Sequence, residues 1–243
     1  MCPLTHIYIA TKVTGTESPL LIIGSVLPDF VWMSGKFPSD KLHDNPIDFY
    51  DFIKSCDKEM LDLGLGMLLH SNAKGADYYS HFYKGGYAMT KGKRLTKDLV
   101  NLFNSKDEKL NLYKAHNFIE AALDMHLLKN NQHLPILYKD AIKKIDIEKI
   151  TQLIYEFTKL DSKLIRRDLA LFFKIFGPES VSSEQAFVSD FFPPILKAAF
   201  HQKASAKEIL SVLNRAKIIT EKDWEDLVSM IIPRMKKDFS EFI

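Results

Sequence analysis

The sequence predicts an all-helical protein that folds as one domain over residues 1–243. Apolar residues recur three or four positions apart along most of the chain, as at Leu95, Leu99 and Leu102, whereas alternating strand patterns are almost absent. The ten glycines and ten prolines stand mainly between these segments. A hydrophobic fraction of 46% is enough for one large core. We expect about ten helices, judged from this periodicity.

The periodicity places helices along the whole chain, and capping signals mark several of their starts. Ser205 with Glu208 and Ser182 with Glu184 are typical helix openings. The expected helices cover residues 4–13, 46–69, 77–90, 95–104, 109–129, 136–145, 147–160, 162–176, 182–202, 206–216 and 221–243.

Composition excludes several classes of protein. A net charge of +2 arises from 33 basic and 31 acidic residues that are mixed along the chain, so there is no strong nucleic-acid signature. Two cysteines, Cys2 and Cys56, are too few for a disulfide framework. The longest apolar stretch near the start, residues 19–30, is too short for a transmembrane segment. We therefore expect a soluble, cytoplasmic protein.

The stretch of residues 64–81 carries the strongest local signal for chemistry. It contains His70, Asp77 and His81, and on a continuous helix these would fall within roughly 40° of one another. Two imidazoles and a carboxylate suit Zn²⁺, Mn²⁺ or Fe²⁺. The alternative is that His70 is a hydrogen-bonded core histidine and Asp77 caps the next helix. Lys74 falls near the same stripe, where it could meet a phosphate.

A second signal is the pair His116 and Glu120, with Asp124 one turn later. Side chains four positions apart on a helix can chelate one ion, although an isolated pair of this kind is more often a surface contact. The residues around the pair are apolar on several sides, which favours a buried helix, and a buried carboxylate needs a partner. We therefore interpret this pair as metal ligands.

Three further candidates are weaker when taken singly. His6 could equally be a structural histidine on a short helix, and Asp29, which follows the apolar residues Leu27 and Pro28, could cap the next segment. His43 stands among loop-forming residues and could be simply exposed. Seven of the eight histidines nevertheless lie before Leu134, the eighth being His201. This bias predicts that residues 1–130 carry the metal site and that residues 131–243 support it.

The order of these residues resembles that of the zinc-dependent phospholipase C family, which is related in fold to fungal single-strand nucleases. The resemblance covers about the first 125 residues. It implies an all-helical protein with two or three metal ions in a cleft between helices of the N-terminal half. The ligands that match the family pattern, in order, are His6, Asp29, His43, His70, Asp77, His81, His116 and Glu120.

The resemblance also implies how the ligands divide among the ions. One ion would be held by Asp29, His43 and His70 with the bridging Asp77, a second by His81, His116 and Glu120, and a third by His6 with Asp77. The sequence departs from the family in two places. The bridging carboxylate is expected four residues after His70, where Lys74 stands, and the chain begins Met1-Cys2 in place of a processed N-terminal ligand.

The resemblance implies a metal-dependent activity, with zinc as the metal, that hydrolyses a phosphodiester or phospholipid head group with a metal-activated water. Asp29 or Asp77 would hold the water and Lys74 would meet the phosphate. The substrate stays open between a lipid, a nucleotide and a small phosphodiester. Aromatic residues near the ligands could line the cleft or belong to the core: Tyr78, Tyr79, Phe82, Tyr83 and Tyr87.

Two other functions fit the sequence. The adjacent His43 and Asp44 in a helical protein are compatible with a diverged HD-type phosphohydrolase, whose metal set would use Asp44 and Asp124. The other is a non-catalytic helical scaffold in which the histidines are structural. The ligand geometry and the metal content of the purified protein would separate these alternatives.

Overall fold

The computed structural model describes residues 2–103, 107–200 and 204–243. Helix accounts for 79% of the chain and the described residues contain no strand, which confirms the all-helical class. The α-helices are α1 (Pro3–Thr14), α2 (Pro19–Val26), α3 (Ile47–Cys56), α4 (Leu61–His70), α5 (Ala76–His81), α6 (Tyr87–Gly92), α7 (Thr96–Phe103), α8 (Glu108–Asn130), α9 (Leu134–Lys144), α10 (Ile147–Thr158), α11 (Ser162–Ile175), α12 (Glu184–Ala186), α13 (Phe192–Phe200), α14 (Ala206–Thr220) and α15 (Trp224–Asp238). Shorter 3₁₀ or π segments are η1 (Leu27–Trp32), η2 (Asp40–Asp44), η3 (Lys58–Met60), η4 (Tyr83–Gly85), η5 (Lys93–Leu95) and η6 (Phe187–Phe191).

The helices are more numerous and shorter than periodicity predicts, because local conformation interrupts two expected helices in the N-terminal half. The expected helix 46–69 is broken at Asp57, which adopts an extended conformation and caps η3 through the backbone nitrogen of Glu59. The expected helix 77–90 is broken after His81, where Gly85 and Gly86 have φ of 87° and 71°. Positive φ suits glycine and ends an α-helix.

The C-terminal half differs from the prediction in similar detail. The expected helix 182–202 is divided into α12, the π segment η6 and α13, and residues 201–203, including His201, lie outside the described residues. The expected helix 206–216 continues to Thr220, and the last helix begins at Trp224. Ser205 and Glu208 form the expected capping box.

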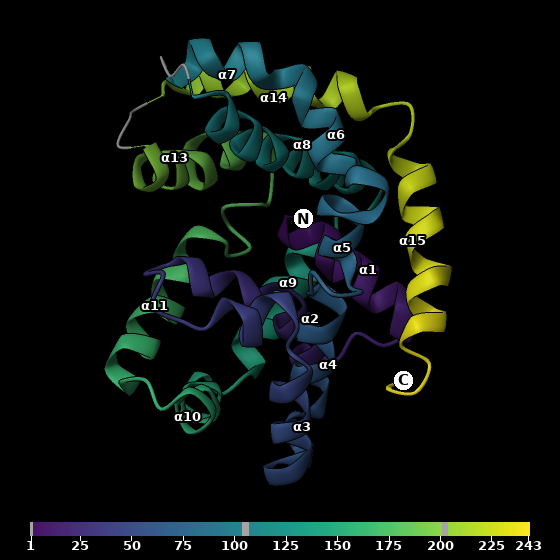
Figure 1. Ribbon diagram of the computed structural model, residues 1–243, viewed down its shortest axis with the longest axis vertical. Helices are drawn as coiled ribbons and strands as arrows, with labels where there is room; N and C mark the ends of the chain where they lie inside the picture. Colours follow the sequence, from purple (N-terminus) through teal and green to yellow (C-terminus); the bar gives the residue numbers. More distant parts are fainter. Residues whose placement is uncertain (1, 104–106, 201–203) are drawn as a thin grey trace.

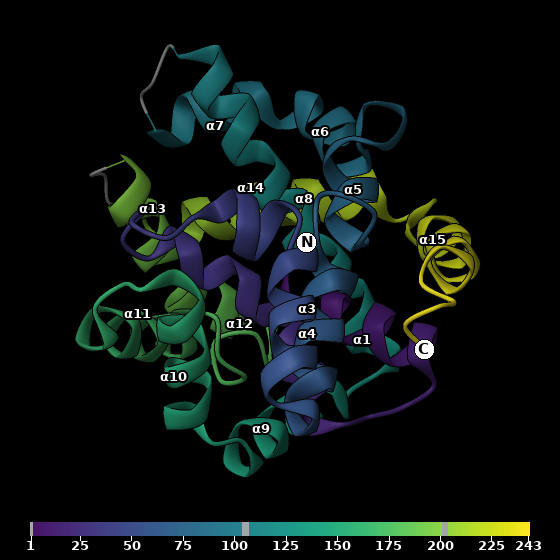
Figure 2. The same ribbon diagram turned by 60° about the horizontal axis from the view of Figure 1, so that its bottom comes forward.

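The long helix α8 organises one side of the molecule, with α6, α7 and α14 packed against it (Figure 1). The centre is formed by α1, α2 and α4, which pack on one another, and α15 lies along α1 (Figures 1 and 2). Helices α10 and α11 pack together at the side away from α15 (Figure 2). The N-terminal helix therefore lies in the interior, between the α8 layer and the α2–α4 pair.

Helices α2 and α4 cross at a glycine contact. A Cβ added to Gly24 would lie 2.1 Å from the carbonyl oxygen of Leu63, and one added to Gly66 would lie 2.4 Å from that of Leu21. Such distances leave no room for any side chain at either glycine. The two backbones therefore touch directly, which brings the ends of both helices to the same place.

The apolar core joins the two halves of the chain. Phe118 of α8 stacks on Phe192 of α13 with ring centroids 4.3 Å apart, and both rings are fully buried. A smaller buried cluster packs Ile231 and Met235 of α15 against the central helices. Within the described ranges, no helix combines the length and the apolar character that crossing a membrane requires.

Candidate metal centre

His6 is carried by α1, and a carboxylate of α8 fixes the start of that helix. Asp124 accepts hydrogen bonds from the backbone nitrogens of Leu4 and Thr5 at 2.9 and 2.8 Å, and from Thr5 Oγ1 at 2.5 Å. Burial raises the pKa of Asp124 to about 7, although these hydrogen bonds favour its charged form. A carboxylate at a helix N-terminus satisfies amides that have no partner within the helix. Asp124 thus positions His6, which is 1% exposed.

Asp29 and His43 come from the two short segments that follow α2. Asp29 lies in η1 directly after Leu27 and Pro28, as expected, and its side chain is 19% exposed. His43 lies in η2 with Nε2 at 3.4 Å from Asp29 Oδ1. Its Nδ1 lies 3.1 Å from Asp44 Oδ1, so the Nδ1 proton is donated to Asp44. Nε2, the nitrogen that faces the site, is therefore the atom that would give up its proton and bind an ion.

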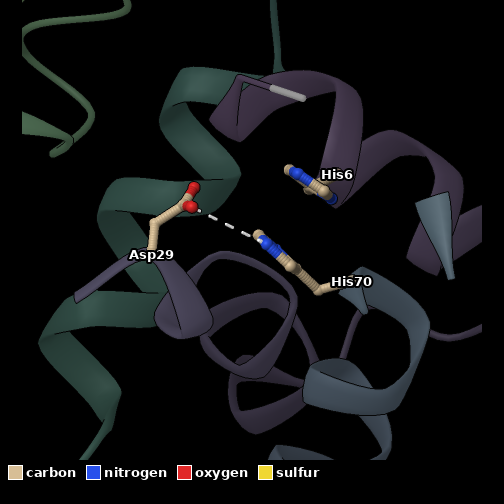
Figure 3. A group of neighbouring side chains, drawn as sticks. All are labelled: His6, Asp29 and His70. Carbon is tan, nitrogen blue, oxygen red and sulfur yellow. Dashed lines mark ion pairs between the residues drawn. The ribbon is translucent and has the colours of Figure 1, made fainter. Parts of the chain in front are cut away.

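His70 ends α4 and is oriented by the glycine contact with α2. Its Nδ1 lies 2.9 Å from the carbonyl oxygen of Ser25, which can only accept, so Nδ1 donates and Nε2 carries the lone pair. Nε2 lies 3.4 Å from His43 Nε2 and 3.8 Å from Asp29 Oδ1. Figure 3 shows Asp29 facing the His70 ring, which stacks on the ring of His6 with centroids 3.9 Å apart.

His70 and Asp77 do not share one helix, so the predicted single stripe is wrong. The chain turns at residues 71–75, and α5 starts in a new direction. A Cβ on Gly75 would lie 2.4 Å from the backbone nitrogen of Ser71, so this turn requires a glycine. Asp77 nevertheless reaches the site, because the turn is compact enough to place the first turn of α5 beside the end of α4.

Asp77 lies at the centre of the site and is 1% exposed. Its Oδ1 lies 3.3 Å from His6 Nε2. Its Oδ2 lies 3.4 Å from His70 Nε2, 3.6 Å from His43 Nε2 and 3.8 Å from His81 Nδ1. A carboxylate whose two oxygens face different imidazoles has the geometry of a bridging ligand. Asp77 therefore has the geometry of the bridging carboxylate that the family resemblance implies at position 74.

The remaining candidate ligands lie on α5 and α8 and face one another. His81 Nε2 lies 2.9 Å from Glu120 Oε1, which also accepts a hydrogen bond of 2.6 Å from Ser80 Oγ. His116 Nε2 lies 4.0 Å from Glu120 Oε2, as expected for residues four apart on one helix. Both residues of the α8 pair are buried, so the surface-pair alternative is wrong.

All eight predicted ligands belong to groups whose donor atoms lie within 4.8 Å of one another. The groups are His6, Asp29 and His70; His43, His70 and Asp77; and His81, His116 and Glu120. The last group matches the expected second ion. The first two share His70 and together contain the ligands expected for the other ions. That these groups bind a cation stays a prediction.

The hydrogen bonding and protonation of the histidine rings also fit a divalent metal. Within the described part of the chain, Nδ1 of His6 and Nδ1 of His116 are buried without a hydrogen-bond partner, and the 3.3 Å contact of His6 Nε2 with Asp77 Oδ1 is not a well-formed hydrogen bond. Burial lowers the pKa of His6 to about 3 and that of His116 to about 4, so both rings are neutral at pH 7. Buried polar atoms normally have partners, and a neutral imidazole is the form that binds metal.

The protonated forms of His43 and His81 are stabilised by neighbouring carboxylates. Burial lowers the pKa of His43, but its hydrogen bonds to Asp29 and Asp44 outweigh this and raise the pKa to about 10. Burial likewise opposes the charge of His81, whose neighbouring carboxylates raise its pKa. A group of carboxylates that binds protons on nearby imidazoles can instead bind a cation, which would displace those protons.

The ligands open into a cleft of about 650 Å³. Asp29, His43, Asp77, His81 and Glu120 are among the residues that line it, whereas His6 and His70 do not line it and are almost fully buried. Figure 3 shows the two rings side by side, each carried by a different helix.

Part of the wall of the cleft is apolar and is built largely by the C-terminal half. It includes Leu171, Ile175, Phe176, Phe191, Pro194 and Ile195. At the mouth, the rings of Trp32, Phe82 and Tyr113 also line the cleft and are about half exposed, at 52%, 57% and 50%. The sequence did not indicate this wall, because its residues carry no chemistry and have the ordinary spacing of core positions.

The aromatic residues expected near the site divide between cleft and core. Phe82 lines the cleft. Tyr79 is buried against the central helices, and Tyr87 donates a hydrogen bond of 2.6 Å to Asp223 at the start of α15. Tyr78 and Tyr83 pack with Tyr79. Most of this aromatic group therefore fastens α5 and α6 to the rest of the fold.

Lysine 74 does not take the position expected for a phosphate ligand. Lys74 is exposed in the turn between α4 and α5 and is not among the residues that line the cleft. The lysine that does line it is Lys114 of α8, whose Nζ lies 4.9 Å from the centroid of the Tyr113 ring. The break in the helix turns Lys74 outward, and Lys114 had no distinguishing signal in the sequence.

Comparison with known proteins adds no identification. No family model, no curated protein and no solved structure matches this chain. The resemblance to zinc-dependent phospholipases C therefore stays a prediction that rests on the order of the ligands.

Proposed function

We propose that this protein is a metal-dependent phosphoesterase, with zinc as the expected ion. The observation that carries the proposal is the environment of Asp77, one buried carboxylate whose oxygens lie 3.3–3.8 Å from nitrogens of four histidines. These histidines come from α1, η2, α4 and α5. Nitrogen and oxygen donors that share a bridging carboxylate suit zinc or a similar divalent ion.

The chemistry that bound ions would supply is activation of a water and stabilisation of negative charge on a phosphoryl group. Asp29 is the carboxylate best placed to orient the attacking water, because its side chain reaches the cleft and remains 19% exposed. Asp77 is too deeply buried for this task and serves as a ligand. Lys114 replaces Lys74 as the residue that would meet the charge of the phosphate.

The shape of the cleft supports an ester with an organic group. The candidate ligands and the apolar residues of α11, η6 and α13 line the same cleft, so a phosphate held by bound ions would have an apolar surface within the cleft for its substituent. Pockets for small molecules commonly combine a mainly apolar lining with a few polar groups.

The HD-type alternative would use Asp44 and Asp124 as ligands, and both are engaged elsewhere. Asp44 accepts hydrogen bonds on the far side of His43, and Asp124 accepts those of α1. Neither belongs to a ligand group in the described structure. The geometry therefore favours the phospholipase C-like set of ligands.

Elemental analysis and hydrolysis assays test the proposal. The protein as purified is expected to contain two or three zinc ions per chain, and to hydrolyse bis(p-nitrophenyl) phosphate in a reaction that a chelator abolishes and zinc restores. His70→Ala is expected to lose both metal and activity, since His70 belongs to two ligand groups. The matched control is His133→Ala, a change at an exposed histidine.

Each result has a defined reading. Less than one ion per chain, with no hydrolysis after metal is added, would favour a non-catalytic scaffold. Full metal content in His70→Ala would overturn the assignment of the ligands. Activity on p-nitrophenyl phosphate but not on the diester would make the protein a phosphomonoesterase.

A further inference from the structure

One amide side chain connects the ligand groups. Asn72 lies in the turn after α4, where its Nδ2 donates a hydrogen bond of 2.7 Å to Asp44 Oδ1 and its Oδ1 lies 3.2 Å from His81 Nδ1. Asp44 is the residue that accepts the Nδ1 proton of His43. Asn72 thus reaches a ligand of the group around Asp77 and a ligand of the group around Glu120.

The orientation of this amide follows from its partners. Asp44 Oδ1 lies 3.1 Å from His43 Nδ1 and 2.7 Å from the amide group of Asn72, and a carboxylate oxygen in this place accepts, so the nitrogen of Asn72 must face it. The oxygen must then face His81, whose Nδ1 donates. With Nδ1 protonated in this way, His81 binds a cation through Nε2, the atom beside Glu120.

We propose that Asn72 couples the loading of the two ligand groups, so that an ion bound by one group raises the affinity of the other. The inference rests on the metal-binding part of the proposed function and does not require hydrolysis. Asn72 contacts ligands without being one, and it therefore acts as a positioning residue.

The coupling follows from the rigidity of the amide plane. An ion on His43 fixes that ring and Asp44 behind it, which in turn fixes the Nδ2 side of Asn72. The oxygen of the same plane is then already oriented toward His81, so the second ion meets a ring in the correct tautomer and orientation. The side chains that are ordered when the first ion binds do not have to be ordered again for the second ion. The second ion therefore binds more tightly, which is positive cooperativity.

The test is a titration of the metal-free protein with Zn²⁺ against a chelating indicator, and with Co²⁺ followed by its visible absorption. The wild type is expected to bind its ions with positive cooperativity. Asn72→Ala is expected to weaken both groups by roughly 10- to 100-fold, the usual effect of removing a residue behind a ligand, and to remove the cooperativity.

Ser80→Ala provides the matched control. It removes a hydrogen bond of 2.6 Å to Glu120, a ligand of one group only, so it should weaken one ion and leave the cooperativity. Asn72→Ser is a second variant that suits a turn, in case the alanine variant does not fold. An Asn72→Ala protein that loses affinity for one ion alone, or that keeps the cooperativity, overturns the inference. Absence of metal binding in the wild type would instead overturn the proposed function.

Discussion

The ligand group around Asp77 and the group around Glu120 are assembled in different ways. His43, His70 and Asp77 come from three separate segments, and all are at most 3% exposed. His81, His116 and Glu120 come from only two helices, and the side chain of His81 is 18% exposed. The first group therefore depends on the whole tertiary fold, whereas the second depends mainly on the spacing within α8 and on one contact with α5.

The largest effect is expected from Asp77, the carboxylate at the centre of the first group. Asp77→Asn removes the charge that faces four imidazoles, and we expect it to abolish the binding of the ions near His6 and His43 and to lower phosphodiesterase activity by at least about 1000-fold. Metal content and kcat/KM are the measurements. Asp51→Asn, at an exposed position of α3, is the control. A variant with full metal content would remove Asp77 from the centre of the site.

A smaller effect is expected when the second group is broken alone. Glu120→Gln should cost one ion and about 100-fold in activity, and should leave the ion near His43 bound, since the first group contains no residue of α8. Elemental analysis of the variant gives the number of ions retained. Loss of every ion would show that the two groups cannot load separately.

These two groups also show how far sequence reasoning reaches. His116 and Glu120 could be predicted as a pair because helix geometry alone fixes residues four apart. The position of Asp77 could not, since the stripe through His70 assumed a continuous helix and the chain instead turns at Gly75. The all-helical class was predictable from periodicity, while the helix ends depended on local conformations such as that of Asp57.

Residues that support the candidate ligands without belonging to a ligand group had no recognisable signal in the sequence. Asn72 and Ser80 are ordinary polar residues whose roles appear only when distant segments meet. The apolar wall that includes Phe176 and Ile195 has the same periodicity as any core helix. Chemistry-bearing residues can be recognised from their type, but these residues are defined by their neighbours alone.

The pH dependence of metal affinity tests the protonation of both groups. His43, with a pKa of about 10, and His81, whose pKa is also raised, must lose a proton when an ion binds. Affinity should therefore rise with pH and fall about tenfold per unit for each displaced proton below the pKa. His116, with a pKa of about 4, adds no such dependence near neutrality. Zn²⁺ affinities measured between pH 6 and 8 that do not change would contradict this protonation scheme.

The smallest effect is expected at Lys114, which lines the cleft but belongs to neither ligand group. Lys114→Met should raise KM for bis(p-nitrophenyl) phosphate and weaken inhibition by inorganic phosphate about tenfold, since one charge-assisted hydrogen bond is lost, and should leave metal content unchanged. Lys109→Met, at an exposed position of the same helix, is the control. Equal KM values in the two variants would assign the phosphate to the ions alone.

The contact between Gly24 and Gly66 suggests how relatives of this chain could be recognised where ordinary alignment fails. A small residue five positions before Asp29 and another four positions before His70 are required together, since each lies against the backbone that carries the other. A search for distant homologues could therefore demand this pair of glycines jointly with the two ligands. Such a joint criterion combines a packing constraint with a chemical one, and few unrelated sequences will satisfy both.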